Sequence, residues 1–326
     1  MAFLTALRRM GRADVTTHEF RSSFRDWAAE RTSFPRAVCE AALAHTAKDN
    51  TEAYHLSTTL GRRTARLAIH HRGLPMSDNN RMYVFICGCA RSGTSTMTDL
   101  LRSHPRFAMG RERYNSLFKR TGSLTVDLFQ KERFCSTLLP GDTHHSTLDN
   151  YYSNLVNRFE ACTHIGDKIP RLYTAYNGLA REFPGCKVIF MVRHIFGVAQ
   201  SFEKRREHSI KNPGAAWPET KGYEQAVTDW NLSLSDTLGV AAEPDIMLVD
   251  YEKLYREDQV LSDIFDFLQS DRTDSVASFW NDACAARSEL DAARPDGLQP
   301  HQKDHLVRSA DFDSYQKLIA MAAQVR

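Results

Sequence analysis

The sequence predicts an α/β fold, a three-layer sandwich with a mostly parallel central sheet, preceded by a small helical segment. Two apolar runs of strand length, Met82–Cys87 and Lys187–Val192, are each followed by a break and then by a helical pattern. Strands that alternate with helices are typical of a parallel sheet with helices on both faces. A hydrophobic content of 42% and a charged content of 25% are ordinary for a globular protein.

The first 75 residues predict helices without strands. Phe20, Phe24 and Trp27 lie at helical spacing within 18–30, and a second helix is expected over 35–45, where Pro35 suits a first turn. This part carries 12 Lys and Arg against 7 Asp and Glu, whereas the remaining residues carry 30 against 33. The charge asymmetry indicates two pieces of different origin. We therefore expect a helical segment at 1–75, a linker at 76–81 and one larger domain at 82–326.

Within the larger domain the elements follow in order. The first strand precedes a Gly-containing loop and a helix whose Met97, Leu100 and Leu101 face inward. The second strand precedes Arg193 and a helix that runs through Ser201 to about residue 208. A third strand is expected over 246–249, and 263–268 is expected to be part of a later helix.

Composition excludes several classes of protein. The longest apolar runs have about six residues, whereas a bilayer span needs roughly 20, so no membrane span is expected. Seven cysteines without a C-x-x-C pair argue against a disulfide framework and a structural zinc site. No cluster of metal-ligand residues is evident, and we expect a cytoplasmic protein that uses no metal.

The stretch MYVFICGCARSGTSTMTDLL, residues 82–101, predicts a strand, a phosphate-binding loop and a helix. Backbone N–H groups at such a turn, together with the helix dipole, favour an anion. Gly88, Gly93 and Ser95 match the spacing of a nucleotide triphosphatase loop, but Thr94 stands where that loop has its lysine. The basic residue lies inside the loop, at Arg91, so ATP or GTP hydrolysis is disfavoured.

This R-S-G-T loop resembles the 5′-phosphosulfate loop of sulfotransferases, which use 3′-phosphoadenosine 5′-phosphosulfate (PAPS) and release PAP. The segment FPGCKVIFMVRHIFGVAQSF resembles the 3′-phosphate motif of that family, which falls on Arg193 and Ser201. The resemblance covers about residues 82–270, is closest to bacterial members of the family, and implies a P-loop-like fold. It implies nucleotide contacts from Arg91, Ser92, Gly93, Thr94, Ser95, Thr96, Arg193, Ser201 and Tyr251.

Two further segments resemble catalytic motifs of tyrosylprotein-sulfotransferase-like enzymes. HPRFAMGRERYNSLF places Glu112 where these enzymes have a catalytic glutamate, and GDKIPRLY places Lys168 where they have a basic residue. The resemblance implies that Glu112 accepts a proton from a hydroxyl or amine acceptor, while Lys168 and Arg91 stabilise charge on the leaving oxygen. An exposed charge cluster around Glu112 and a plain loop lysine are the alternative readings of these residues.

Residues 7–69 resemble the carboxy-terminal end of a phage-type tyrosine recombinase, or integrase. The H-x-x-R motif of that family falls on His18 and Arg21, its second histidine on His45 and its nucleophilic tyrosine on Tyr54. The family's other arginine and its hairpin lysine have no counterpart in the chain. Because catalysis needs all donors around the developing charge, we expect an inactive remnant without DNA binding.

Three functions from different classes compete at this point. A PAPS-dependent sulfotransferase is favoured, a P-loop kinase or NTPase is second, and a DNA-binding protein derived from a recombinase is third. The acceptor, whether carbohydrate, lipid, small molecule or peptide, is not encoded in any motif, since loops build the acceptor pocket. The oligomeric state is equally open.

Overall fold

The structure of the protein, a computed structural model, describes residues 81–323 except 144–147, 149, 213, 214, 216 and 293–296. The helices expected over 18–30 and 35–45, nearly all of the linker, and His18, Arg21, His45 and Tyr54 lie outside the described residues.

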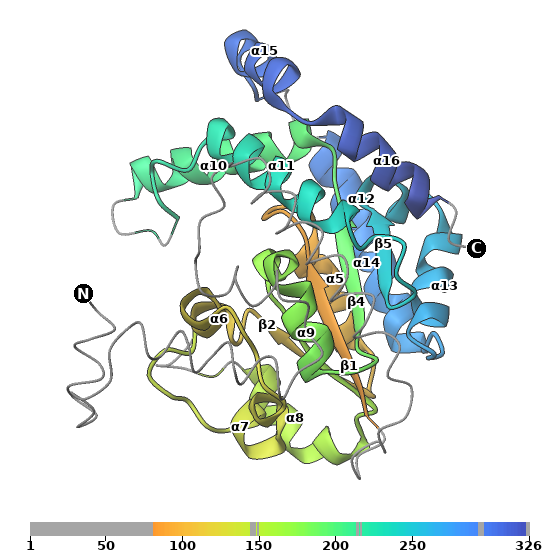
Figure 1. Cartoon of the computed structure of the whole chain (residues 1–326). Helices are drawn as coiled ribbons and strands as arrows, with labels where there is room; N and C mark the ends of the chain where they lie inside the picture. Colours follow the sequence, from red (N-terminus) through yellow and green to blue (C-terminus); the bar gives the residue numbers. More distant parts are fainter. Residues whose placement is uncertain are drawn as a thin grey trace, which may run out of the picture. The chain divides into compact units, whose positions relative to one another are not determined.

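A five-stranded parallel sheet forms the centre of the described part (Figure 1). Its spatial order is β2-β3-β1-β4-β5, and every neighbouring pair is parallel. The strands are β1 (Met82–Cys87), β2 (Phe107–Arg111), β3 (His164–Lys168), β4 (Lys187–Val192) and β5 (Ile246–Asp250). The expected strands at 82–87 and 187–192 are confirmed, and the third is one residue longer than expected.

Helices of very different lengths connect the strands. The α-helices are α5 (Thr94–Ser103), α6 (Asn115–Thr121), α7 (Lys131–Cys135), α8 (Asn150–Arg158), α9 (Tyr176–Glu182), α10 (Ile195–Lys211), α11 (Tyr223–Leu238), α12 (Tyr251–Leu254), α13 (Asp258–Phe267), α14 (Asp274–Ala292), α15 (Pro300–Ser309) and α16 (Phe312–Ala322). Three short 3₁₀ turns are η1 (Val126–Phe129), η2 (Phe159–Ala161) and η3 (Pro170–Ala175). No helix in the described ranges is both long and apolar enough to cross a bilayer.

Two hydrophobic cores lie on opposite faces of the sheet, because successive side chains of a strand point in opposite directions. In β1, Val84 and Ile86 join a core with α5, α13 and α14, whereas Phe85 and Cys87 join a core with α8, α10, α11 and α16. All four side chains are fully buried. The result is the three-layer sandwich that the sequence predicts.

No pattern in the sequence predicts β2 and β3. FAMGR and HIGDK are short and contain glycine and charged residues, so neither shows the apolar run or the alternation expected of a strand. In the structure β3 is buried along its whole length between β1 and β2. Its Gly166 is required by this packing, because a Cβ there would lie 1.5 Å from the carbonyl oxygen of Val84.

The strand order creates a site at the carboxyl ends of the strands. In the sheet, β2 lies on one side of β1, and β5 lies on the opposite side of β4. The connection after β1 and the connection after β4 therefore run in opposite directions, and a crevice lies between these two adjacent strands. Ligands of open α/β sheets bind at such a point. Every predicted site residue lies at or shortly after the carboxyl end of one of these strands.

Candidate active site

The loop between β1 and α5 presents backbone donors to this crevice. Helix α5 begins at Thr94 with neither a side-chain cap nor an acidic residue in its first turn, so no side chain of the described residues caps its first N–H groups. Gly93 has φ 88°, and a Cβ there would lie 2.4 Å from the ring of Tyr251. Thr94, Ser95 and Thr96 thus start a helix whose open N-terminus suits an anion.

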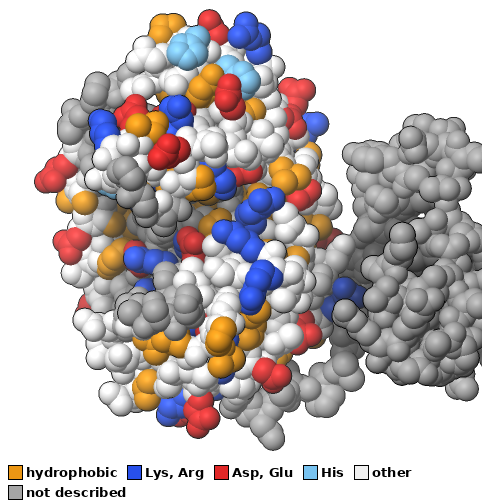
Figure 2. Space-filling view, turned by 90° about the vertical axis from the view of Figure 1, so that its left-hand side faces the viewer, with side chains coloured by type: hydrophobic (Ala, Val, Ile, Leu, Met, Phe, Trp, Pro, Cys, Tyr) orange, Lys and Arg blue, Asp and Glu red, His pale blue; other side chains and the backbone are white. Residues whose placement is uncertain are grey.

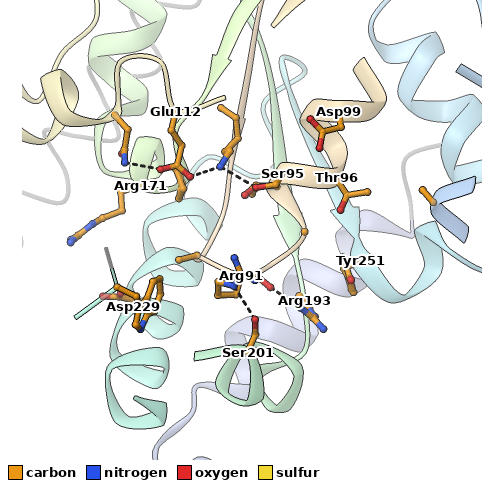
Figure 3. A pocket seen from close by; sticks show the side chains of 18 of the residues that line it. Arg91, Ser95, Thr96, Asp99, Glu112, Arg171, Arg193, Ser201, Asp229 and Tyr251 are labelled. Atoms are coloured by element: carbon orange, nitrogen blue, oxygen red, sulfur yellow. Dashed lines mark hydrogen bonds and ion pairs between the residues drawn. The ribbon is translucent and has the colours of Figure 1, made fainter. Parts of the chain in front are cut away.

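Arg91, Arg193 and Ser201, which lie far apart in the sequence, come together beside this loop (Figure 3). Arg91 Nε donates to Ser201 Oγ at 2.9 Å, and Arg193 Nη1 donates to the Arg91 carbonyl oxygen at 2.7 Å. The Arg193 guanidinium also lies 4.3 Å from the centre of the Tyr251 ring. The loop arginine is therefore joined to the residues expected to hold a 3′-phosphate.

The cations around the loop repel one another. Burial lowers the pKa of Arg91, and the neighbouring charges of Arg205 and Arg193 lower it further. Arg193 itself is 94% buried, since only 6% of its surface is exposed. An anion bound between these groups would relieve the repulsion, so the site is electrostatically suited to a phosphate.

Glu112, Lys168 and Ser95 form a second cluster on the other side of the loop. Lys168 Nζ donates to Glu112 Oε1 at 2.5 Å and to Ser95 Oγ at 3.3 Å. Asn115 Nδ2 donates to Glu112 Oε2 at 3.0 Å. The Lys168 side chain is 2% exposed and that of Glu112 is 34% exposed. A buried lysine therefore links an accessible carboxylate to the phosphate-type loop.

Register and a buried carboxylate fix the position of Glu112. Arg111, the last residue of β2, pairs with Lys168, the last residue of β3, and the Glu112 N–H donates to the Lys168 carbonyl at 3.0 Å. Glu112 has φ 59°, an unusual value for a residue other than glycine. Fully buried Asp167 accepts the next two backbone N–H groups, those of residues 113 and 114, at 3.1 and 2.8 Å.

The raised pKa of Asp167 predicts that the free energy of unfolding depends on pH. Burial raises its pKa to about 7 although the two N–H donors favour the carboxylate. The native state then binds this proton more tightly than the unfolded state does. The contribution to stability is full below about pH 4 and is lost as the pH rises to about 7, with a slope of up to about 1.4 kcal/mol per pH unit. Urea unfolding at several pH values should show that Asp167→Asn removes this slope; identical slopes would contradict the assignment.

A cavity of about 530 Å³ contains both clusters. Its lining has seven basic side chains against three carboxylates, Asp99, Glu112 and Asp229. The basic residues are Arg91, Lys119, Lys168, Arg171, Arg193, Lys221 and Arg287. Figure 2 shows Lys and Arg side chains across the middle of one face of the molecule. The cavity is therefore suited to a ligand with several negative charges.

The structure brings together every predicted site residue except one. Arg91, Gly93, Thr94, Ser95, Thr96, Glu112, Lys168, Arg193, Ser201 and Tyr251 line the cavity, whereas Ser92 of the same loop is buried and does not line it. Within the described ranges, no group of three His, Cys, Asp or Glu side chains is arranged to hold a metal ion.

Several lining residues are missing from the sequence-based prediction of the site. Asn115 lies three residues after Glu112 in the segment GRERYN, and this spacing could have indicated that the two side chains interact. Arg171 follows Lys168 by three residues within GDKIPRLY and could have been predicted in the same way. Asp229 and Arg287 lie in α11 and α14 without any motif, and only the fold reveals them.

Comparison with known proteins identifies the family of the chain. The family model described as the sulfotransferase family matches residues 84–274, which is more than half of the chain. No curated protein matches the chain.

Solved structures include similar chains. The sulfotransferase domain from the curacin biosynthetic pathway is 21% identical over 60% of this chain and 76% of its own, with a TM-score of 0.41. The sulfotransferase from Alicyclobacillus acidocaldarius is 16% identical over 74% and 94%, with a TM-score of 0.42. Mouse sulfotransferase SULT7A1, solved with PAP, is 12% identical over 75% and 89%, with a TM-score of 0.43. On the family match over residues 84–274, this chain belongs to the sulfotransferase family.

Proposed function

We propose that the protein transfers the sulfuryl group of PAPS to a hydroxyl or amine of an acceptor, releases PAP and uses no metal. One observation carries this proposal: a single cavity holds a loop with open backbone donors, an Arg91–Arg193–Ser201 cluster on one side and a Glu112–Lys168 pair on the other. The first two suit the two anionic ends of a nucleotide, and the third suits the chemistry of transfer.

The donor set fits PAPS. Arg193 and Ser201 would hold the 3′-phosphate, since an arginine fork and a hydroxyl together suit one phosphate. The N–H groups of the first turn of α5 would hold the 5′-phosphosulfate. Arg91 lies between the two, because its side chain reaches Ser201 while its backbone belongs to the loop. Tyr251, buried beneath Arg193 and against Gly93, limits the depth of the nucleotide site.

When bound, PAPS supplies an activated sulfuryl group with PAP as its leaving group. Glu112 accepts the proton of the acceptor hydroxyl or amine, and its ion pair with Lys168 fixes the direction of the carboxylate. Lys168 contacts Ser95 of the loop and therefore places positive charge where the leaving oxygen becomes negative. The lysine that the loop lacks at Thr94 thus has a counterpart on β3.

The rival functions receive less support. A P-loop kinase or NTPase uses a loop lysine on the β- and γ-phosphates, and Thr94 supplies none. A recombinase function would depend on residues outside the described part. The cysteine pattern of the sequence and the five buried free thiols of the described residues support a reducing compartment, so the proposal includes a cytoplasmic location. It also includes a bacterial origin, which rests on the resemblance of the sequence motifs to bacterial sulfotransferases.

The function is tested by incubating the full chain with PAPS and a mixed panel of alcohols, phenols, sugars and amines. PAP release that requires both PAPS and an acceptor is expected, together with an acceptor product heavier by one sulfuryl group in the mass spectrum. Transfer of a phosphoryl group from ATP to the same panel, with PAPS inert, would contradict the proposal.

We also propose that residues 1–75 are an integrase-like remnant, that 76–81 link it to the enzyme, and that the transferase occupies 82–326. The first strand begins at Met82 and the family match begins at residue 84, which support this division. A chain that starts at Met76 should fold and keep PAP affinity, whereas residues 1–75 alone should neither unfold cooperatively nor cleave DNA, since chains of that size are marginal. A loss of PAP affinity of more than about tenfold would make the first segment part of the enzyme.

A further inference from the structure

The cavity continues beyond Glu112, on the side away from the nucleotide residues. In Figure 3, Arg171 and Asp229 lie on the opposite side of Arg91 and Glu112 from Tyr251. Because Glu112 is the residue placed to accept the acceptor's proton, this region is where the rest of the acceptor must lie. We call it the acceptor side.

Three cations from three separate elements line the acceptor side. Lys119 lies one helical turn after Asn115 on α6 and therefore on the same face as the residue that bonds Glu112. Arg171 comes from η3, and Lys221 precedes α11. Arg171 and Asp229 lie on the same side of the cavity in Figure 3, and Lys221 lies just before the helix that carries Asp229.

These cations lack ion-pair partners among the described residues. No ion pair there joins Lys119, Arg171 or Lys221 to an acidic side chain, although the charge of Arg171 acts on Asp236, whereas Lys168 is paired with Glu112. The remaining carboxylate on this side, Asp229, is 8% exposed and accepts a hydrogen bond from Gln225 at 2.9 Å. In the cavity lining on this side, one carboxylate against three cations leaves an excess of positive charge facing the acceptor.

We propose that the acceptor carries a negatively charged group, a carboxylate, sulfate or phosphate, close to the hydroxyl or amine that is sulfated. The proposal rests on the proposed function of the same site and adds the substrate class. Lys119, Arg171 and Lys221 bind the acidic group. Asp229 repels it and so restricts the positions that the group can occupy. A cavity lined by one sign of charge attracts such an acceptor and disfavours cationic ones.

The test is a binding measurement on the full chain saturated with PAP, with two matched pairs of probes. One pair is a tyrosine peptide with neighbouring aspartates and its counterpart with asparagines. The other is an oligosaccharide of glucuronic acid units and its glucose counterpart. The acidic member of at least one pair should bind at least about tenfold more tightly than its neutral partner. The pair that discriminates identifies whether a peptide or a carbohydrate carries the charge.

Charge-removal variants then locate the effect. Lys119→Gln, Arg171→Gln and Lys221→Gln combined should abolish the preference for the acidic probe and leave PAP affinity unchanged. The control removes equal charge from exposed positions outside the cavity, Lys204→Gln, Arg308→Gln and Lys317→Gln, and should keep the preference. If neither acidic probe binds more tightly than its neutral partner, or if the first variant keeps the preference, the inference is wrong. Failure to bind PAP at all would instead refute the proposed function.

Discussion

Glu112→Gln is expected to lower turnover of PAPS by about two to four orders of magnitude while PAP affinity stays near that of the wild type. Glutamine has the shape of glutamate, and its amide oxygen still accepts from Lys168 Nζ. What it loses is the basicity needed to take a proton from the acceptor. The loss should therefore appear in kcat and not in the binding of the nucleotide.

Two measurements separate this role from others. Calorimetry with PAP reports the nucleotide site, and PAP release from PAPS reports turnover. Glu207→Gln makes the same chemical change at an exposed position outside the cavity and should leave both unchanged. Unchanged turnover in Glu112→Gln would remove this residue from the mechanism, and a parallel loss of PAP affinity would make it a structural residue.

Arg193→Ala is expected to weaken PAP binding roughly 10- to 100-fold, because a hydrogen bond to a charged group contributes about 1.5–3 kcal/mol. Affinity for 5′-AMP, which lacks the 3′-phosphate, should change little. The side chain also bonds the Arg91 carbonyl and stacks on Tyr251, so a purely structural role is the rival explanation.

The two nucleotides distinguish these explanations. If Arg193 acts on the 3′-phosphate, the ratio of PAP to 5′-AMP affinity falls in the variant. If it only supports the loop, both affinities fall together and the ratio stays the same. Arg193→Lys serves as the matched variant: it keeps the charge but loses the planar fork, and an intermediate PAP affinity is expected.

The sequence predicted best where patterns are local. Strand β1 is buried over its last four residues and β4 over its last five. The loop after β1 has its glycines at a recognisable spacing, so the fold class and the position of Arg91 could be predicted directly. Helix α5 buries Met97, Leu100 and Leu101 as its periodicity predicts. Tyr251 lies where the third predicted strand ends.

Contacts between distant segments could not be predicted from pattern. Arg91 and Ser201 are 110 residues apart, and Lys168 and Ser95 are 73 apart. Glu112 and Lys168 were identified through resemblance alone, since β2 and β3 show no strand pattern. Asp167 was missed because a buried aspartate at a strand end is indistinguishable in sequence from an exposed one; its role depends on backbone N–H groups that only the fold positions.

The central claim is that the cavity recognises a nucleotide with a 3′-phosphate, and titration of the full chain with PAP, 5′-AMP and ATP in one calorimetric series tests it most directly. The comparison needs no knowledge of the acceptor, and PAP differs from 5′-AMP only in the 3′-phosphate that Arg193 and Ser201 are placed to hold. We predict that PAP binds at least about tenfold more tightly than either of the others. Equal affinity for PAP and 5′-AMP, or tighter binding of ATP, would contradict the account.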